Sequence, residues 1–570
     1  AIGWINGLQS QGVGASLKHF AGNSQETDRL RADSLIDPIA LHELYLEAFR
    51  LAVTSAKPES VMIAYNRLNG TYMSDHAYLL TTVLQKQWGF DGLVVTDWGA
   101  LNDKVAALNA GTDLEMPSSG HLFDHQALAS KQIVPAALDR AVKHIRTMAM
   151  KVRPQVMDSQ ADLWQQHGQL AQTIEEQSAV LMKNDGILPL DAGKSLTVIG
   201  ALGNETRIQG AGSSHITTPE TISIVEGVTR AGHQFSAVPG YRLDDLPAPE
   251  LVQEAIQAAQ HAEQVVMVVG LPDTAEAEGR DRDDLALPSQ QVALLHAVAQ
   301  VNHNVVVLLV AGSVVTTPWA SETKAILNLF LGGQRVGAAA EHLLFGKISP
   351  SGKLAETYPQ QLSDLPTFSL YNRQPHKQSI PYAESLYVGY RYADKANLQP
   401  AFPFGFGLSY TTFSLKKIQL SAKTIADDPI MVDVTVHNTG NMRGAEVVQV
   451  YVGPVDQDQL VPIKILAAFQ KVWLAPGAQQ VVTLTLPTRA FSRWDDTEQG
   501  FRLAGGEWQV SVGTASRAIA QTFTIQVTAS AFKLTVPDWY RHPHGQPSLS
   551  DFTALTGVEI KPDPPQTPGH

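Results

Sequence analysis

The stretch Gly92-Leu93-Val94-Val95-Thr96-Asp97-Trp98-Gly99-Ala100 places a single carboxylate directly after a short apolar run. The run is entered through a turn and left through two small residues, which is typical of a buried parallel strand that ends in a loop. Such a strand holds Asp97 at its C-terminal tip, where catalytic side chains gather in barrels and open α/β sheets. Asp is also a common helix cap, and this segment alone does not separate the two interpretations.

The chain around this stretch alternates short apolar strands with amphipathic helices, which predicts βα units and a parallel sheet. A second series of this kind predicts a second α/β domain over residues 194–365, after a mainly helical connector over residues 151–193. We expect strands at 14–17, 60–64, 93–96, 195–200, 264–270 and 304–312, and helices at 38–55 and 79–88.

The helical period disappears after an aromatic, Pro-rich and Gly-rich linker at residues 366–410. Alternating strands separated by turns then predict a β-sandwich of fibronectin or immunoglobulin type over residues 411–530. A tail at residues 531–570 is rich in proline and is expected to wrap a surface or to be loosely held. We expect the strands of the sandwich at 430–437, 446–453, 481–486, 508–513 and 522–527.

Composition excludes several classes of function. A chain of 570 residues should hold about three or four domains. Its formal charge of −13 argues against nucleic acid as a partner, and its longest apolar runs are too short to cross a membrane. The absence of cysteine excludes disulfides and thiol nucleophiles. Residues 1–11 lack a signal-peptide pattern, so a cytoplasmic location is expected, with secretion or a periplasmic location left open.

Two further strand ends carry polar side chains. Lys18 and His19 follow the strand predicted at residues 14–17, and both can donate hydrogen bonds to neutral hydroxyl groups such as those of sugars. Tyr65 follows the strand predicted at residues 60–64. Taken alone, Lys18 and His19 are better explained as part of a solvated loop. Tyr65 alone is as well explained as a packed residue before an Asn-Gly turn. Three polar strand ends in one half-domain favour a site.

A second carboxyl group comes from the loop at residues 273–282, which follows the apolar strand predicted at residues 264–270. The loop contains Glu276 and Glu278 and has no apolar periodicity, so its default interpretation is a solvated loop. It nevertheless leaves the C-terminal end of a strand, which is the usual position of the crevice in an open α/β sheet.

Five segments together resemble glycoside hydrolase family 3 along almost the whole chain. They are LKHFAGN at 17–23, TDWGA at 96–100, VLMKNDGILPL at 180–190, GKISPSGKLAETYP at 346–359 and FPFGFGLSYTTF at 402–413. The resemblance implies an α/β multidomain fold. It comprises a partial (β/α)8 TIM-like barrel over residues 1–150, an α/β sandwich domain and a C-terminal fibronectin type III-like β-sandwich.

The resemblance also assigns roles to residues. Asp97 matches the catalytic nucleophile, and Glu278 is the preferred acid/base because Glu-Gly-x-Asp-Arg resembles the family's acid/base loop, with Glu276 as the alternative. As the acid, Glu278 is expected to have a raised pKa through partial burial or nearby negative charge. The implied substrate-binding residues are Lys18, His19, Arg29, Tyr65 and Trp98.

The implied activity is that of a retaining exo-acting β-glycosidase, in the first instance a β-glucosidase that works through a covalent glycosyl-enzyme. The alternatives are a β-xylosidase or an α-L-arabinofuranosidase of the same family and, from another class, a non-catalytic carbohydrate-binding scaffold. No metal or organic cofactor is expected. The expected partners are β-glucosides or short oligosaccharides, with a homodimer left open.

One feature departs from the family pattern. LKHFAGN lies about halfway through the barrel of family members, yet here it begins at residue 17. We therefore expect only the C-terminal half of the barrel, with the first half lost, cleaved or carried on a separate segment. A half barrel leaves an open strand edge.

Overall fold

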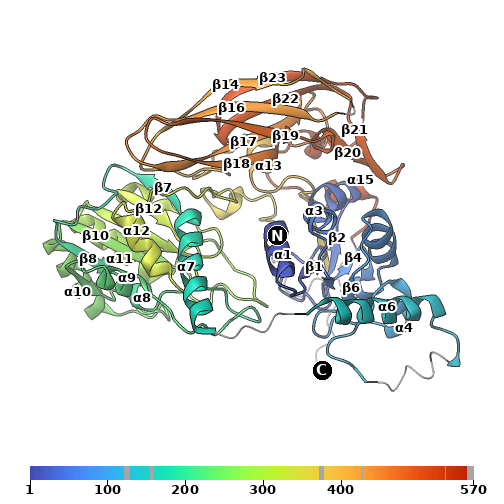
Figure 1. Ribbon diagram of the computed structural model, residues 1–570, viewed down its shortest axis with the longest axis horizontal. Coiled ribbons are helices and arrows are strands. Elements are labelled where there is room, and N and C mark those ends of the chain that lie inside the picture. The colour runs from blue at the N-terminus through green and yellow to red at the C-terminus, as the bar shows by residue number, and fades with distance from the viewer. Residues whose placement is uncertain are drawn as a thin grey trace.

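The computed structural model describes residues 1–120, 127, 129–153, 160–371, 378–426, 428–532 and 534–560. It contains three bodies (Figure 1): a set of strands and helices near the N-terminus, a helix-covered sheet in the middle of the chain, and a β-sandwich that lies across both. None of the described helices combines the length and apolar character needed to cross a bilayer.

The first body corresponds to the partial barrel predicted over residues 1–150 and is called the barrel region below. It is built from parallel strands in the order β1-β3-β6. These strands are β1 (Ser16–Phe20), β3 (Ser60–Ile63) and β6 (Leu93–Val95), and an isolated parallel bridge from Val95 to Leu114 continues the row. Each predicted strand of this region is present, and helices connect them as expected. The prediction that Lys18 and His19 follow the first strand is wrong, because β1 extends to Phe20 and contains both residues. The helices are α1 (Ile2–Ser10), α2 (Pro38–Ala40), η1 (Leu41–Tyr45), α3 (Glu47–Ala56), η2 (Met73–Asp75), η3 (Tyr78–Gln87) and α4 (Lys104–Ala110).

A second, smaller sheet was not predicted. It has the order β13-β2-β4-β5 and joins the linker to the barrel region, because β13 pairs in parallel with β2. Its strands are β2 (Asp33–Leu35), β4 (Arg67–Leu68), β5 (Thr71–Tyr72) and β13 (Ser379–Pro381).

Two long helices, α6 (Pro135–Lys151) and α7 (Gln160–Ser178), lead to the second body. The expectation of a helical connector through residue 193 is wrong for β7 (Val180–Asn184), which pairs antiparallel with β12 (Ala325–Asn328) at the edge of the middle sheet. Residues 180–182 are buried and apolar, so they pack as a strand rather than continue the helix.

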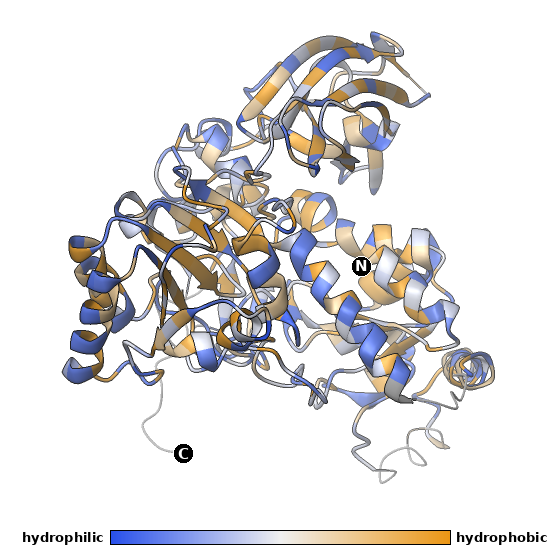
Figure 2. Ribbon diagram, turned by 60° about the vertical axis from the view of Figure 1, so that its left-hand side comes forward, coloured by the Kyte–Doolittle hydropathy of each residue, from blue (hydrophilic) through white to orange (hydrophobic). Residues whose placement is uncertain are grey.

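The middle sheet has the order β7-β12-β11-β10-β8-β9, and its other pairings are parallel. Every residue of β10 (Gln264–Gly270) and β11 (Val305–Val310) is buried, as expected for central strands with helices on both faces. Figure 2 shows this apolar sheet beneath more polar helices. The remaining elements are β8 (Leu196–Ile199), β9 (Phe235–Val238), α8 (Ala201–Asn204), α9 (Ile224–Arg230), α10 (Pro249–His261), α11 (Ser289–Val301), η4 (Pro318–Glu322), α12 (Val336–Leu344), η5 (Leu362–Asp364) and α13 (Tyr390–Lys395).

The third body is a β-sandwich of two sheets, β14-β16-β19 and β15-β23-β22-β17-β18, with inward-facing Val, Ile and Leu side chains and Trp508 between them. The predicted sandwich is confirmed. Its elements are β14 (Phe413–Leu420), β15 (Thr424–Ile425), β16 (Ile430–Asn438), β17 (Gly444–Pro454), β18 (Ile465–Leu474), β19 (Gln479–Leu486), η6 (Thr488–Phe491), β20 (Ser492–Asp495), β21 (Gly500–Leu503), β22 (Gly506–Ala515) and β23 (Ala518–Val527).

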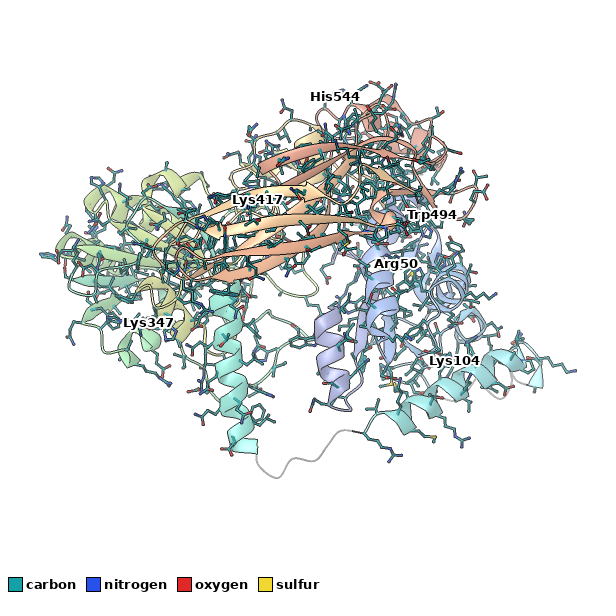
Figure 3. All side chains as sticks on the ribbon, turned by 45° about the horizontal axis from the view of Figure 1, so that its top comes forward. Arg50, Lys104, Lys347, Lys417, Trp494 and His544 are labelled. Carbon is teal, nitrogen blue, oxygen red and sulfur yellow. The ribbon has the colours of Figure 1, made fainter. Side chains whose placement is uncertain are left out.

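The sandwich is fixed to the barrel region by charged and aromatic contacts beside Trp494, which Figure 3 labels together with Arg50. Arg493 is buried and its Nε lies 3.0 Å from both carboxylate oxygens of Glu43. His42 stacks on Trp494 with 3.5 Å between ring centroids, and burial lowers the pKa of His42 to about 4, so the stacked ring is neutral at pH 7. These contacts give the barrel region a fixed orientation against the sandwich.

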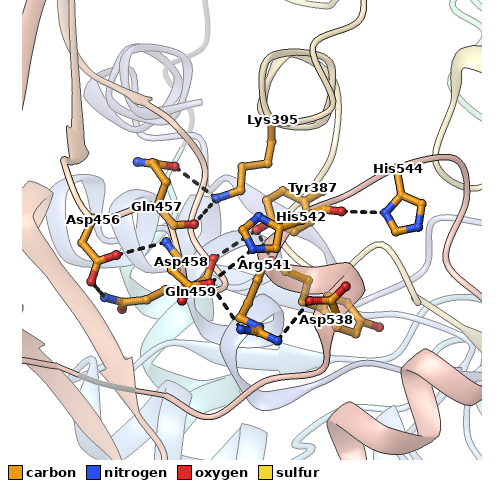
Figure 4. A network of polar contacts seen from close by, with 11 residues as sticks. Tyr387, Lys395, Asp456, Gln457, Asp458, Gln459, Asp538, Arg541, His542 and His544 are labelled. Carbon is orange, nitrogen blue, oxygen red and sulfur yellow. Dashed lines mark hydrogen bonds and ion pairs between the residues drawn. The ribbon is translucent and has the colours of Figure 1, made fainter.

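The described part of the tail packs on the linker and the sandwich through α14 (Asp538–Arg541) and α15 (Leu549–Thr556). Arg541 and His542 contact Asp458, while Lys395 donates to the Gln457 carbonyl at 2.6 Å (Figure 4). The expectation that the tail wraps a surface is confirmed for residues 534–560, and residues 561–570 lie outside the described residues.

Candidate active site

Asp97 lies two residues beyond the end of β6, at the C-terminal edge of the parallel strands, and is largely buried. Its Oδ1 accepts a hydrogen bond of 2.7 Å from the backbone N–H of Trp98. Its Oδ2 lies 3.0 Å from His19 Nε2. Asp97 does not cap α4, since the N-cap side chain of that helix is Asp103. The cap interpretation of the sequence is therefore wrong, and the carboxylate is left to face other polar side chains.

His19 is in β1, two strands away from Asp97, and its side chain is 32% exposed. Burial is the largest cause that lowers the pKa of His19, and the charges of Lys18 and Arg29 lower it further. The imidazole is therefore neutral at pH 7, and its Nε2–H donates to Asp97, because an ionised carboxylate only accepts. Lys18 itself is exposed.

Tyr65 and Arg29 extend the cluster away from Asp97. Burial raises the pKa of Tyr65 to about 12, and the hydrogen bond of its hydroxyl to Asp97 contributes to the rise. The Arg29 guanidinium lies over the Tyr65 ring, 4.6 Å from its centroid. Arg29 Nη2 then reaches Glu278 Oε1 at 3.0 Å. A continuous path of side chains thus joins Asp97 to a carboxylate of the middle domain.

Glu278 comes from the loop that follows β10, and its Oε2 accepts from both the backbone N–H, at 2.8 Å, and the hydroxyl of Ser213. The Ser213 donors, followed by Arg29, lower the pKa of Glu278 to about 2. The expectation of a raised pKa is therefore wrong for this arrangement, because the carboxylate is surrounded by donors and a cation rather than by apolar atoms.

Glu276 contacts residues of its own domain instead of the barrel region. Its Oε2 accepts a hydrogen bond of 2.8 Å from Arg207 Nη1. It accepts a second one, of 3.1 Å, from the backbone N–H of Gly312 at the C-terminal edge of the middle sheet. Burial opposes ionisation of Glu276, but hydrogen bonds from Ser313, Arg207 and Gly312 lower its pKa overall. Glu276 is thus an ion-pair partner within the middle domain, whereas Glu278 contacts the barrel region.

The structure brings together Asp97, His19, Tyr65, Arg29 and Glu278. It leaves Trp98 56% exposed beside them. His19 also lines a cavity of about 550 Å³, bounded by Leu44, Phe49 and Tyr382 among others. Asp97 and Glu278 do not line this cavity, so the polar contacts rather than the cavity define the candidate site.

Ser213 was not identified from the sequence. It follows Gly212, whose φ is +103°, and a Cβ atom at Gly212 would lie 2.5 Å from the Cβ of Glu278. Only glycine therefore allows this loop to approach the carboxylate so closely. The run Gly210-Ala211-Gly212-Ser213, in the loop that follows α8, was the signal available, since small residues let the backbone approach another group closely.

The described residues contain no group of three or more His, Asp or Glu side chains arranged to hold a metal ion. What the cluster offers instead is two carboxylates from two domains, with neutral and cationic donors between them. This combination can attack and protonate the two sides of a polar bond.

Most of the chain matches three known domain families. Residues 1–148 match the glycosyl hydrolase family 3 N-terminal domain, residues 179–410 the family 3 C-terminal domain, and residues 446–516 the fibronectin type III-like domain. These three regions coincide with the barrel region, the middle domain with its linker, and the sandwich.

Individual proteins similar to this chain support the same family. The chain is 42% identical to thermostable beta-glucosidase B of Acetivibrio thermocellus, over 93% of this chain and 71% of the relative. It is also 42% identical to an exo-alpha-(1->6)-L-arabinopyranosidase of Bifidobacterium breve, over 95% of this chain and 72% of the relative. The crystal structure of a family 3 beta-glucosidase of Bifidobacterium adolescentis superposes with a TM-score of 0.89 at 40% identity, covering 97% of this chain and 81% of that one. The chain therefore belongs to glycoside hydrolase family 3, in its β-glucosidase-like, three-domain type.

Proposed function

We propose that this protein is a retaining, exo-acting β-glucosidase that releases terminal β-D-glucosyl residues from β-glucosides or short oligosaccharides. The observation that supports this most is the path from Asp97 through Tyr65 and Arg29 to Glu278. It gives a nucleophile at a rigid strand tip and a second carboxyl group that approaches from another domain.

In the proposed mechanism, Asp97 attacks the anomeric carbon while Glu278 transfers a proton to the leaving glycosidic oxygen. The Ser213 and Arg29 donors hold the pKa of Glu278 at about 2 in the substrate-free protein, so the mechanism requires bound substrate to displace these donors and raise that pKa. The bond to the aglycone breaks and a glucosyl ester of Asp97 forms. Water then attacks the same carbon, gives its proton to Glu278 and releases Asp97. Two displacements at one carbon retain the β configuration. Lys18 and Arg29 can donate to sugar hydroxyls, whereas His19, whose Nε2–H donates to Asp97, can accept from one through Nδ1.

The direct test is hydrolysis of an aryl β-D-glucoside followed by NMR of the first sugar formed. We expect β-D-glucose before mutarotation, and only glucose from the non-reducing end of a short β-linked oligosaccharide. First appearance of α-D-glucose, or no release from any β-glycoside, would contradict the proposal. The latter outcome would leave the carbohydrate-binding scaffold as the better description.

A second specificity is favoured by the equal identity to the arabinopyranosidase. A β-D-glucopyranoside and an α-L-arabinopyranoside both carry an equatorial glycosidic bond, so the same carboxylate pair suits both. They differ in the orientation of the 4-hydroxyl and in the C6 hydroxymethyl group, which the arabinoside lacks. A panel of p-nitrophenyl β-D-glucoside, α-L-arabinopyranoside, β-D-xyloside and α-L-arabinofuranoside, compared by kcat/KM, separates these activities. We expect the glucoside to be preferred.

The pH dependence offers a further test through Ser213. We expect Ser213→Ala to raise the pKa of Glu278, because the Ser213 hydroxyl is the largest cause of its lowered value. The acid must be protonated in the first displacement, so a higher pKa keeps the active form to higher pH. The basic limb of the kcat/KM profile should therefore move to higher pH. Ser214→Ala, at the exposed neighbouring position, is the matched control. An unchanged limb in Ser213→Ala would contradict this role.

A further inference from the structure

The loop that carries Glu278 and a loop of the barrel region bind each other's backbone. Glu26, in the segment between β1 and β2, accepts a 2.7 Å hydrogen bond from the backbone N–H of Gly279 through its Oε2. In return, Asp281 accepts from the backbone N–H of Glu26 at 3.0 Å and from that of Thr27 at 2.7 Å. Each loop thus supplies one carboxylate and receives one.

A third segment closes this contact. The hydroxyl of Tyr371, from the linker, donates to Asp281 Oδ1 at 2.5 Å. Burial opposes the ionised form of Asp281, but hydrogen bonds from Thr27, Tyr371 and Glu26 lower its pKa overall. The Asp281 carboxylate is therefore charged at neutral pH, and hydrogen bonds to a charged acceptor are the stronger ones.

This contact flanks Glu278 directly. Gly279 is its neighbour in the chain, and the Glu26 oxygen that binds Gly279 also accepts from Arg29 Nη1 at 2.7 Å. Arg29 in turn holds Glu278. The segment around Glu278 has no helix or strand of its own, so contacts with other loops must fix where the carboxyl group lies.

The chemistry makes this position critical. Asp97 belongs to the barrel region and Glu278 to the middle domain, so the separation of the two carboxyl groups depends on how the domains meet. Retaining enzymes need that separation to be about 5 to 5.5 Å. A misplacement of about 1 Å can lower a rate about 10²-fold.

We propose that Asp281, with Glu26 as its reciprocal partner, is a positioning residue that clamps the acid/base loop onto the barrel region and thereby sets the distance from Glu278 to the substrate. The inference rests on the proposed function, because it takes Glu278 to be the proton donor. It predicts that loss of the clamp impairs proton donation rather than folding or nucleophilic attack.

Asp281→Asn removes the charge and one of the two acceptor oxygens at almost unchanged volume. We expect kcat/KM for phenyl β-D-glucoside, whose leaving group needs the proton, to fall about 10²-fold. For 2,4-dinitrophenyl β-D-glucoside, whose leaving group needs little assistance, we expect a change below about threefold. Asp283→Asn, an exposed carboxylate of the same loop, is the matched control and should leave both values unchanged. Equal losses on both substrates, or no loss on either, would overturn the proposal.

Hydrogen exchange supplies a readout that needs no substrate. In Asp281→Asn the amides of Glu26 and Thr27 should exchange about tenfold faster, since each loses a hydrogen bond to a charged group. If Asp281→Asn does not fold, Tyr371→Phe removes a single donor from the same carboxylate and should show both effects in weaker form. Unchanged exchange at these amides would overturn the clamp itself. Faster exchange in an enzyme that hydrolyses no glycoside would instead place the error in the proposed function.

Discussion

Asp97→Asn should lower kcat/KM for an aryl β-D-glucoside by about 10⁴-fold or more, the largest loss expected from any single substitution in this chain. The amide has no nucleophilic oxygen anion, so the first displacement cannot occur at a useful rate. The fold should survive, because the Asn oxygen can still accept from the backbone N–H of Trp98. Neutral His19 can turn its unprotonated nitrogen towards the amide.

The control for this substitution is Asp91→Asn. Asp91 is exposed and lies at the opposite end of the same strand, β6, so the same chemical change there should leave kcat/KM unaltered. A 2-fluoro-β-glucoside should also leave one fluoroglucosyl group on the peptide that contains Asp97, detected by mass spectrometry. If Asp97→Asn retained more than a few per cent of activity, or the label appeared on another residue, the nucleophile assignment would be wrong.

The strands that position this carboxylate were predictable because their signals are local. β10 spans residues 264–270 as predicted, and β3 and β6 match their predicted positions to within one residue. Each run is bounded by turn residues and is too short for a helix. Asp97 at the tip of β6 follows from the same pattern.

The smaller sheet shows what local signals miss. β4 and β5 are two residues long, and β13 contains Pro381 and pairs with β2, more than 300 positions earlier in the chain. Strands of two or three residues have no measurable period, and proline argues against a strand. Their existence depends on tertiary contacts between the linker and the barrel region.

The surroundings of Glu278 were unpredictable for a related reason. The loop pattern identified the residue, but its lowered pKa comes from Ser213, 65 positions away, and from Arg29 of another domain. A sequence shows that a carboxyl group is available, whereas the donors that reach it are fixed only when the domains pack. The same limit applies to Glu276, whose partner Arg207 distinguishes it from Glu278.

Glu278→Gln should separate the acid/base from its neighbour. We expect kcat/KM for phenyl β-D-glucoside to fall by about 10² to 10⁴-fold, because no proton is supplied to the leaving oxygen. The loss should be much smaller for 2,4-dinitrophenyl β-D-glucoside. For this substrate the second displacement becomes limiting, since no base activates water. Added azide attacks without needing a base, so it should restore turnover and give β-glucosyl azide.

Glu276→Gln is the matched comparison, two residues away on the same loop. It breaks the ion pair with Arg207, so it should destabilise the middle domain without making the rate depend on the leaving group or on azide. The two variants therefore differ in kind and not only in degree. If azide restored Glu276→Gln and not Glu278→Gln, then Glu276 would be the acid/base, and the contact between Arg29 and Glu278 would be an interdomain ion pair and nothing more.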